Sequence, residues 1–491
     1  MAMKKSILLI ISSCLLVSAT IYGQSIDSLI KKAESGDAAA QFNLAEKYLQ
    51  GKGVPSNKAK AFYWFKKGAE QGNADAQDWL AFMYDNGVGT QKDENKAFYW
   101  FKKSAEQGNA DAQYNLALMY DNGLKTQKDE NEAFYGYKKS VEQGNADAQF
   151  SLATMYLEGK GTLKNLDSTF YWYKKAAEQG DADAQYGLAA VYDNGFGTQK
   201  DEKKAFYWYK KSAVQGNADA QYQLALMYGG GIGTQQDFKK AFYWFKKGAE
   251  QGDIGAQYML ALMFQNGKGT LKDLNKAFYW YKKSAEQGDA DAQNNLAYMY
   301  RFGEGTIKDL NRAFYWFKKS AEQGNAKAQY GLAIVYDNGF GTQKDENKAF
   351  YWYKKSAEQG NADAQFGLAF MYDNGFGTQK DENKAFYWYK ISAEQGNAGA
   401  QNNLGVMYDK GQGVLTDPKQ AFYWYKKSAE QGGVGAQYML AFDYYYGEGT
   451  QINKKQAAYW MRKAYDKGFQ PAKDAWDKLE LWKYEGEKLT H

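Results

Sequence analysis

Side chains that commonly carry out chemistry in proteins are scarce in this sequence. Its 491 residues include one histidine, His491, and one cysteine, Cys14. Catalytic triads of the Ser-His-Asp or Cys-His type need a histidine, and zinc and haem are held mainly by histidine and cysteine. The sequence therefore predicts no metal ion and no cofactor. A pair of carboxylates is the catalytic arrangement that residue type leaves open.

Most carboxylates, however, recur at equivalent positions of a repeated pattern, whereas an active site normally uses a unique set of residues. Asp-Asn-Gly triplets such as 85–87 lack the alternating oxygen ligands and closing glutamate of a calcium loop. Gly-Phe-Gly-Thr runs such as 195–198 lack the Gly-Lys-Ser/Thr of a phosphate loop. We expect both to be turns, and we expect the protein not to be an enzyme.

The repeated pattern has a period of 36 residues without insertion or deletion. It is marked by Gly36, Gly72, Gly108, Gly144, Gly180, Gly216, Gly252, Gly288, Gly324, Gly360, Gly396, Gly432 and Gly468. A period of this length indicates stacked supersecondary units, each of which buries its apolar face against the next. The sequence predicts twelve such units.

Each unit divides into two predicted helices. Asn73 is a favourable N-cap for the first helix, and Gly87 stands where a left-handed residue ends it. Asp93 caps the second helix, and Pro418, directly after the equivalent Asp417, occupies the first helical position, where proline is best tolerated.

Apolar and small residues at three- and four-residue spacing predict the buried stripes of both helices. The first stripe contains Ala74, Gln77, Leu80, Ala81 and Tyr84, and the second contains Ala97, Trp100, Phe101, Ser104 and Ala105. We expect Trp100 to be core and its neighbour Tyr99 to reach solvent.

The pattern Ala-Gln-x-x-Leu-Ala/Gly-x-x-Tyr-x-x-Gly-x-Gly, then Asp-x-x-x-Ala-x-x-Trp-x-x-x-Ala-x-x-Gly, resembles the Sel-1-like repeat, a relative of the tetratricopeptide repeat. The resemblance covers residues 36–467. It implies an all-α, right-handed superhelix of helix-turn-helix repeats that presents a concave groove to protein partners. Some members of the family carry a disulfide in each repeat; this chain lacks the cysteines, so properties peculiar to them are not transferred.

The flanking segments are predicted from their alignment with half-repeats and from their polarity. Residues 1–23 resemble a signal peptide with a basic start at Lys4 and Lys5, cleaved after Gly23 or, alternatively, after Ala19. Lipidation at Cys14 and an uncleaved membrane anchor are further alternatives. Residues 24–35 are predicted to form a capping helix, and residues 468–491 a second capping helix followed by a polar tail from 480. The predicted location is therefore the periplasm or the exterior of the cell.

Candidate binding residues lie on the first helices, outside the predicted stripe. The aromatic column comprises Phe42, Tyr114, Phe150, Tyr186, Tyr222, Tyr258, Tyr330, Phe366 and Tyr438, and its exceptions are Asp78, Asn294 and Asn402. One turn earlier lies the aspartate column, Asp75, Asp111, Asp147, Asp183 and Asp219, with Asp291 and Asp363 further on. Aromatic residues are favoured at interfaces, so these columns would suit an extended, partly basic peptide. The alternative is that the rings only pack between helices.

One repeat departs from the pattern at several positions. Between Gly108 and Gln143, Lys125 replaces a loop glycine, Gly136 replaces the tryptophan and Val141 replaces an alanine. Loss of a packed tryptophan typically costs about 3–5 kcal/mol, so we expect a small pocket near Gly136, with drift in a redundant copy as the alternative.

These observations predict a non-enzymatic scaffold that binds protein partners. The net charge of +5 is close to neutral for this length, which argues against nucleic acid as the partner. The alternative function is binding of envelope glycan or peptidoglycan through the repeated surface tyrosines. The sequence leaves the partner and the oligomeric state open.

Overall fold

The computed structural model describes residues 26–124 and 127–484. The predicted signal peptide with Cys14, the loop residue Lys125 and the end of the predicted tail lie outside these residues. The chain forms two compact units, Met1–Asp237 and Phe238–His491, and each is described by itself. Their boundary falls inside a repeat, between its two helices.

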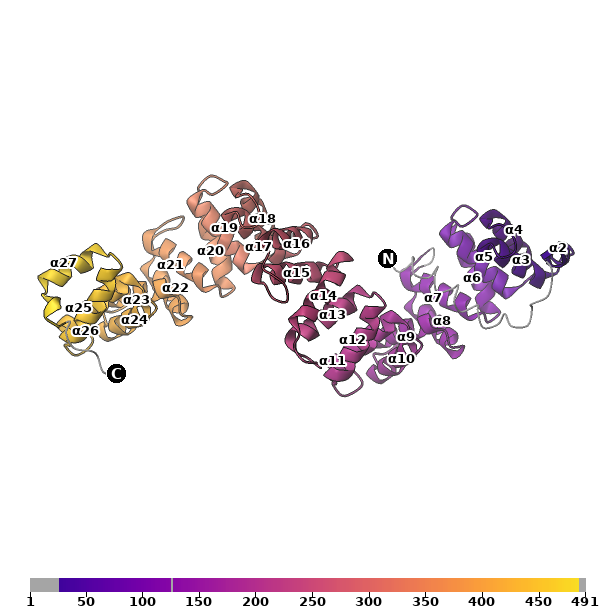
Figure 1. Ribbon diagram of the computed structural model, residues 1–491, viewed down its shortest axis with the longest axis horizontal. Coiled ribbons are helices and arrows are strands. Elements are labelled where there is room, and N and C mark those ends of the chain that lie inside the picture. The colour runs from indigo at the N-terminus through magenta and orange to yellow at the C-terminus, as the bar shows by residue number, and fades with distance from the viewer. Residues whose placement is uncertain (1–25, 125–126, 485–491) are drawn as a thin grey trace. The chain divides into compact units, whose positions relative to one another are not determined.

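The first unit contains a single helix, α2 (Ile26–Glu34), followed by helix pairs (Figure 1). Its first helices are α3 (Ala38–Gln50), α5 (Ala74–Asn86), α7 (Ala110–Asn122), α9 (Ala146–Glu158), α11 (Ala182–Asn194) and α13 (Ala218–Gly230). Its second helices are α4 (Lys58–Glu70), α6 (Glu94–Glu106), α8 (Glu130–Glu142), α10 (Leu166–Glu178) and α12 (Glu202–Val214). Helices that follow one another in this unit pack together.

The second unit continues the same alternation. Its first helices are α15 (Ile254–Asn266), α17 (Ala290–Phe302), α19 (Ala326–Asn338), α21 (Ala362–Asn374), α23 (Ala398–Lys410) and α25 (Val434–Tyr446). Its second helices are α14 (Phe238–Glu250), α16 (Leu274–Glu286), α18 (Leu310–Glu322), α20 (Glu346–Glu358), α22 (Glu382–Glu394), α24 (Pro418–Glu430) and α26 (Lys454–Asp466). The unit ends with α27 (Gln470–Lys478) and a 3-10 helix, η3 (Leu481–Tyr484). The described part of the chain contains no strand, so the predicted all-α array of helix-turn-helix repeats is confirmed.

The ends of the helices follow from the residues that flank them. The Asn73 side chain accepts a hydrogen bond from the Ala76 amide, and the Asp93 side chain accepts one from Lys96. Gly87 ends α5 in the left-handed conformation, with φ of 65°, which only glycine adopts without strain. The predicted caps are confirmed, and the Asp-Asn-Gly triplet at 85–87 is the end of a helix.

Small residues allow the helices to approach closely. Ala76, Ala81 and Ala97 are fully buried, together with Leu80. Burial of one leucine side chain contributes about 1.5–3 kcal/mol, so a single helix pair has a small core and stability accumulates along the stack.

The prediction that Trp100 is a core residue was only partly right. Phe101, one residue later, is 4% exposed, whereas Trp100 is only partly buried and packs edge-on against Tyr99. One residue is a rotation of about 100° on a helix, so Phe101 continues the line of Ala97 while Trp100 lies at its border. Tyr99 is 52% exposed, which confirms that it reaches solvent.

The two ends of the array are closed by single helices. On α2, Leu29 and Ala33 are buried against the first repeat. On α27, Trp476 is 5% exposed. The segment that follows, predicted as a polar tail from residue 480, instead begins with η3, and Leu481 is completely buried because it joins the core around Trp476. None of the described helices has the length and apolar character needed to cross a membrane.

Candidate binding surface

All nine residues of the aromatic column lie on first helices and are half-buried. Seven of them contact the aromatic residue of the second helix in the same repeat, with ring centroids 5.7–6.0 Å apart: Phe42–Phe65, Tyr114–Tyr137, Phe150–Tyr173, Tyr186–Tyr209, Tyr258–Tyr281, Tyr330–Tyr353 and Phe366–Tyr389. Tyr438 packs instead against Phe442 and Phe469. The rings therefore do pack between helices, and they keep part of their surface for solvent.

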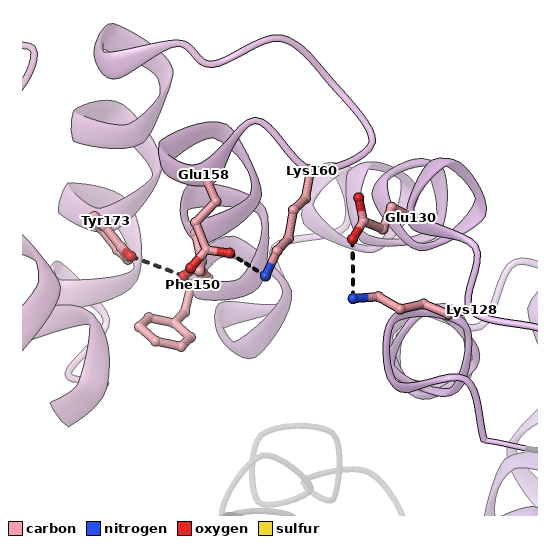
Figure 2. Close-up of polar contacts among 7 residues, drawn as sticks. Lys128, Glu130, Phe150, Glu158, Lys160 and Tyr173 are labelled. Atoms are coloured by element: carbon pink, nitrogen blue, oxygen red, sulfur yellow. Dashed lines mark hydrogen bonds and ion pairs between the residues drawn. The ribbon is translucent and has the colours of Figure 1, made fainter.

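Phe150 illustrates how the column is built (Figure 2). Its ring lies 5.7 Å from that of Tyr173, whose hydroxyl shares a 2.9 Å hydrogen bond with Thr154. The ion pairs Glu158–Lys160 and Lys128–Glu130 lie nearby at the end of α9 and the start of α8, and the Phe150 ring points away from both. The Phe150 ring thus contacts a neutral partner, and the acid of the aspartate column that lies one turn before it is Asp147.

The aspartate column occupies the edge of the same face. Asp75, Asp111, Asp147 and Asp219 are exposed, and Asp183 is half-buried. Three of them accept a hydrogen bond from the N-cap asparagine of the following repeat: Asn109 to Asp75 at 2.8 Å, Asn145 to Asp111 at 2.8 Å, and Asn217 to Asp183 at 2.7 Å. The column thus holds neighbouring repeats in register, a role that its sequence position alone did not reveal.

Successive aspartates in the column also influence one another. Partial burial, followed by the charges of Asp111 and Asp183, raises the pKa of Asp147. Partial burial and the charge of Asp75 raise the pKa of Asp111, against the lowering effect of the Asn145 hydrogen bond. Repulsion between like charges has this sign, so successive aspartates of the column act on one another.

A buried acid takes the place of the ring in the second repeat. The Asn115 amide donates a 3.3 Å hydrogen bond to Asp78. Burial, followed by the charge of Asp111, raises the pKa of Asp78 to about 8, so this carboxyl is mostly protonated at neutral pH. At the two other exceptions, Asn294 and Asn402, the buried side-chain oxygen has no hydrogen-bond partner.

The second unit lacks a continuous aspartate column. The equivalent residues are Gly255, Asp291, Lys327, Asp363, Gly399 and Gly435. Asp291 and Asp363 still accept hydrogen bonds from Asn325 and Asn397, at 2.7 and 2.8 Å. The two units therefore share the aromatic column but differ in charge on its edge.

A small pocket was expected near Gly136, and the structure shows which atoms lie close to this glycine. A Cβ atom added to this glycine would lie 2.8 Å from the Ala117 Cβ and 3.3 Å from the Gln113 carbonyl oxygen. Helix α7 therefore lies close to the backbone of α8 at Gly136. The contact shows that the first side-chain atom would be crowded here, and the pocket that an indole ring would fill stays a prediction.

The second helices carry a separate row of aromatic residues. The row consists of Tyr63, Tyr99, Tyr135, Tyr171, Tyr207, Tyr243, Tyr279, Tyr315, Tyr351, Tyr387, Tyr423 and Tyr459, which are 38–56% exposed. Lysines one turn later lie over many of these rings, as Lys211 does over Tyr207 at 5.0 Å. A row of exposed rings with nearby cations is a chemically distinct second surface.

Consecutive helix pairs that contact one another and repeat the same side chains define a helical-repeat solenoid, of the kind that acts as a scaffold for protein interaction. The Sel1 repeat model matches residues 38–73, 74–109, 110–145, 146–181, 182–217, 218–253, 254–289, 290–325, 326–361, 362–397, 398–433 and 434–469. The chain belongs to the Sel1 repeat family.

One solved structure supports this assignment, and a second is reported beside it. The protective antigen c5321 of uropathogenic Escherichia coli, which has the same repeat fold, is 34% identical, with a TM-score of 0.78 over 96% of this chain and 99% of the antigen. A Sel1 repeat protein from Oxalobacter formigenes is 32% identical, with a TM-score of 0.49 over 63% of this chain and 90% of its own. A comparison with curated proteins found no match.

Proposed function

We propose that this protein is an exported, non-enzymatic scaffold that binds an extended basic segment of a partner protein along the first helices of its first unit. The observation that carries the proposal is the aspartate column, which runs without a break from Asp75 to Asp219 beside the aromatic column. Rings supply apolar contact area, and carboxylates attract and orient lysine or arginine side chains. The concave groove expected of such a solenoid would place both columns against the ligand.

The continuity of the column supports an extended ligand over a compact one. The aspartate column and the aromatic column both repeat once in every 36 residues of the protein. A ligand that lies along them in an extended conformation would therefore meet the same pair of groups several times. Several weak contacts on one chain combine into a firm complex when the spacing allows them to form together.

The direct test compares two variants that each lose four acids. In the column variant, Asp75, Asp111, Asp147 and Asp183 become asparagine, which keeps the acceptor oxygen for the caps. In the control, Glu70, Glu106, Glu142 and Glu178, at the ends of second helices, become glutamine. We expect a lysine- and arginine-rich peptide of about 20 residues to bind the natural chain and the control equally, and the column variant at least tenfold more weakly. Equal binding by all three proteins would contradict the proposal.

Substitution of the rings separates binding from packing. Tyr114→Leu with Tyr186→Leu keeps apolar volume while removing the aromatic faces. If the rings contact the ligand, peptide affinity falls while the unfolding midpoint changes little. If the rings only pack, the midpoint falls and the affinity of the folded protein is unchanged.

Export is part of the proposal and rests on residues 1–23. A basic start followed by an apolar run is typical of a secretory signal. N-terminal sequencing of the protein recovered from the envelope or the medium should begin at Gln24. A chain that begins at Met1 and fractionates with the cytoplasm would reject this part alone.

The exposed tyrosine row favours a second candidate function, binding of envelope glycan. Aromatic side chains offer a flat apolar face as well as a polar edge, and here they recur at a fixed spacing. Co-sedimentation with insoluble peptidoglycan tests it. Loss of sedimentation after Tyr135→Ser, Tyr171→Ser and Tyr207→Ser, all in the first unit, would favour glycan, whereas sedimentation that the column variant abolishes would favour a basic peptide stem as the target.

A further inference from the structure

Four loops of the array carry an aliphatic residue that lies almost wholly in solvent. The tip residue of each loop, two positions before the cap of the second helix, is glutamine in seven repeats: Gln91, Gln127, Gln199, Gln235, Gln343, Gln379 and Gln451. In four others it is Leu163, Leu271, Ile307 or Leu415, and these four residues are 87–88% exposed. One exposed leucine is common on a protein surface, but four at one position of a repeat, where the other copies are polar, form a pattern.

In three of these four loops, the lysine after the tip residue has also lost an acidic partner. Five repeats read Gln-Lys-Asp-Glu at this point, and in each the lysine pairs with the glutamate at 2.7–3.2 Å: Lys92–Glu94, Lys128–Glu130, Lys200–Glu202, Lys344–Glu346 and Lys380–Glu382. The loops of Leu163, Leu271 and Ile307 have leucine in place of that glutamate, at positions 166, 274 and 310. Among the described residues, Lys164, Lys272 and Lys308 form no ion pair. The two aliphatic residues therefore occur together, with an unpaired lysine between them.

Two of these three loops are neighbours in the second unit. The loop with Leu271 leads into α16, and the loop with Ile307 leads into α18. A Cβ atom added to Gly305 would overlap the carbonyl of Leu274, so the loop with Ile307 rests on the first residue of α16. Leu271 stands three positions before that contact. The two aliphatic tips therefore belong to one edge of the second unit.

This edge carries an excess of positive charge. Residues 267–272 and 303–308 together contain three lysines and one glutamate. The caps that follow them are already paired, Asp273 with Lys276 at 3.0 Å and Asp309 with Arg312 at 3.3 Å. The unpaired lysines therefore set the sign of the charge beside the aliphatic tips.

The backbone holds both loops in a fixed conformation. Each loop contains two glycines with φ between 66° and 76°, at 267 and 269 and at 303 and 305. The Asp273 amide donates a 2.9 Å hydrogen bond to the Phe264 carbonyl, and the Asp309 amide donates a 2.8 Å bond to Tyr300. Each loop is thus tied to the helix before it, so binding through its tip would not first have to order the loop.

We propose that the loops at 267–274 and 303–310 bind the surface of an anionic lipid bilayer, with Leu271 and Ile307 inserted and Lys272 and Lys308 against the headgroups. A bilayer accepts a protruding aliphatic side chain without a matching cavity, and its anionic headgroups attract lysine. The alternation of aliphatic and basic residues satisfies both layers of such a surface. The inference goes beyond the proposed function and stands without it.

Vesicle co-sedimentation tests the tips with a residue that the chain itself uses. The double variant Leu271→Gln with Ile307→Gln installs the glutamine found in seven other repeats. Because both residues are exposed, we expect its unfolding midpoint to be unchanged. The protein begins at Gln24, so the apolar run of the signal sequence is absent and every described residue is kept.

Two further double variants separate the effect of charge at these loops from charge in general. Lys272→Gln with Lys308→Gln removes the lysines beside the aliphatic tips. Lys344→Gln with Lys380→Gln is the matched control, because it removes two lysines from the same position of loops in the second unit that have glutamine at the tip.

The vesicles contain phosphatidylglycerol with phosphatidylethanolamine, or phosphatidylcholine alone. We expect the natural chain and the control to bind the anionic vesicles alike, and both loop variants to bind them about tenfold more weakly. Binding to phosphatidylcholine vesicles should be weaker, and high salt should weaken binding to the anionic ones.

A fluorescent label reports insertion itself. The chain from Gln24 contains no cysteine, so one introduced cysteine can carry an environment-sensitive fluorophore. A label at Ile307→Cys should shift its emission to the blue when anionic vesicles are added, because the tip enters an apolar layer. A label at Gln379→Cys, the same position two repeats further on, should not shift.

Equal vesicle binding by Leu271→Gln with Ile307→Gln, or an unshifted label at position 307, would overturn the proposal. So would a natural chain that binds neither kind of vesicle, a result that would leave a protein as the occupant of these loops. The column variant of the first unit should bind vesicles as the natural chain does, so the test is independent of the peptide-binding proposal.

Discussion

The side-chain oxygen of Gln77 accepts a 2.7 Å hydrogen bond from the amide of Gln107. The amide of Gln77 in turn donates to the Ala69 carbonyl at 3.1 Å. One buried side chain thus joins α4, α5 and α6. The same pair recurs as Gln41–Gln71, Gln113–Gln143, Gln149–Gln179, Gln185–Gln215, Gln257–Gln287, Gln293–Gln323, Gln329–Gln359, Gln365–Gln395 and Gln401–Gln431.

The last repeat breaks this pair and predicts a stabilising substitution. Lys467 stands where the second glutamine is expected, its ammonium binds the Gly432 carbonyl, and Gln437 Oε1 is left buried without a partner. Lys467→Gln should supply the missing donor and raise the free energy of unfolding by about 1 kcal/mol, measured by urea denaturation. The reverse change, Gln431→Lys, should lower it by a similar amount; a gain from both changes would contradict the explanation.

The second loop glycine should matter more inside the array than at its start. Gly341 has φ of 71°, and a Cβ added to it would overlap the carbonyl of Leu310 in the preceding repeat. Gly53, at the equivalent position of the first repeat, has φ of 78° but no atom within 4 Å of such a Cβ.

Alanine at either position therefore meets the cost of a left-handed conformation, about 1–2 kcal/mol. Gly341→Ala adds overlap with backbone, which costs about 1–3 kcal/mol more. Thermal and urea unfolding should show the larger loss for Gly341→Ala. Equal losses would mean that the contact between repeats relaxes without cost.

Asp181 predicts a dependence of stability on pH. It caps α11, and burial, followed by the repulsion of Asp183 and Asp147 against the lowering effect of the Ala184 amide, raises its pKa to about 6 from an ordinary value of 3.8. The folded state therefore binds more protons than the unfolded state between these values. Its contribution to stability is greatest below pH 4 and is lost as the pH rises through 6.

Asp181→Asn should remove this loss. Asparagine would keep the cap and donate to Asp147, as Asn145 donates to Asp111 in the preceding repeat. We expect the variant to be more stable at pH 7 by about 1–3 kcal/mol and to lose the slope between pH 4 and 6. Denaturation curves at pH 4, 5, 6 and 7 measure both effects, and an unchanged slope would show that Asp181 is not its source.

At Gly136 we expect alanine to destabilise the protein, which is the opposite of what helix propensity alone predicts. Alanine is favoured over glycine inside helices by about 1 kcal/mol, but a Cβ here would press on Ala117. Because overpacking costs about 1–3 kcal/mol, Gly136→Ala should lower the unfolding midpoint, and Gly136→Trp should lower it further. Gly435→Ala is the control, since its Cβ would have only Asn402 Oδ1 at 3.4 Å. If Gly136→Trp were instead more stable than the natural protein, the result would support a pocket at this position.

Much of this fold could be predicted from the sequence, because it depends on residues that are close together along the chain. Asn73, Asp93 and Gly87 identified helix ends because capping depends on residues that adjoin the helix in sequence. Which of Trp100 and Phe101 is more deeply buried could not be predicted in this way. Both suit a helix border, and only the angle at which α5 and α6 meet decides which ring is enclosed.

The candidate binding surface could likewise be predicted only in part from the sequence. The aromatic and aspartate columns were visible in the sequence because they recur at a fixed period. Their contacts were not, since Asn109 and Asp75 lie 34 residues apart and meet only when neighbouring repeats stack. Asp443 also stands out in the sequence, as an acid where ten other repeats have methionine or valine, but only the structure shows that it is buried.

The sequence by itself determined the helix pair, its period, its caps and the residues that each copy repeats, because these follow from spacing within a few turns of chain. Only the tertiary structure decided which rings are enclosed, which amides pair across repeats, and how closely α7 lies against Gly136. Those outcomes depend on distances between helices, and such distances are set by the packing of all side chains at an interface together.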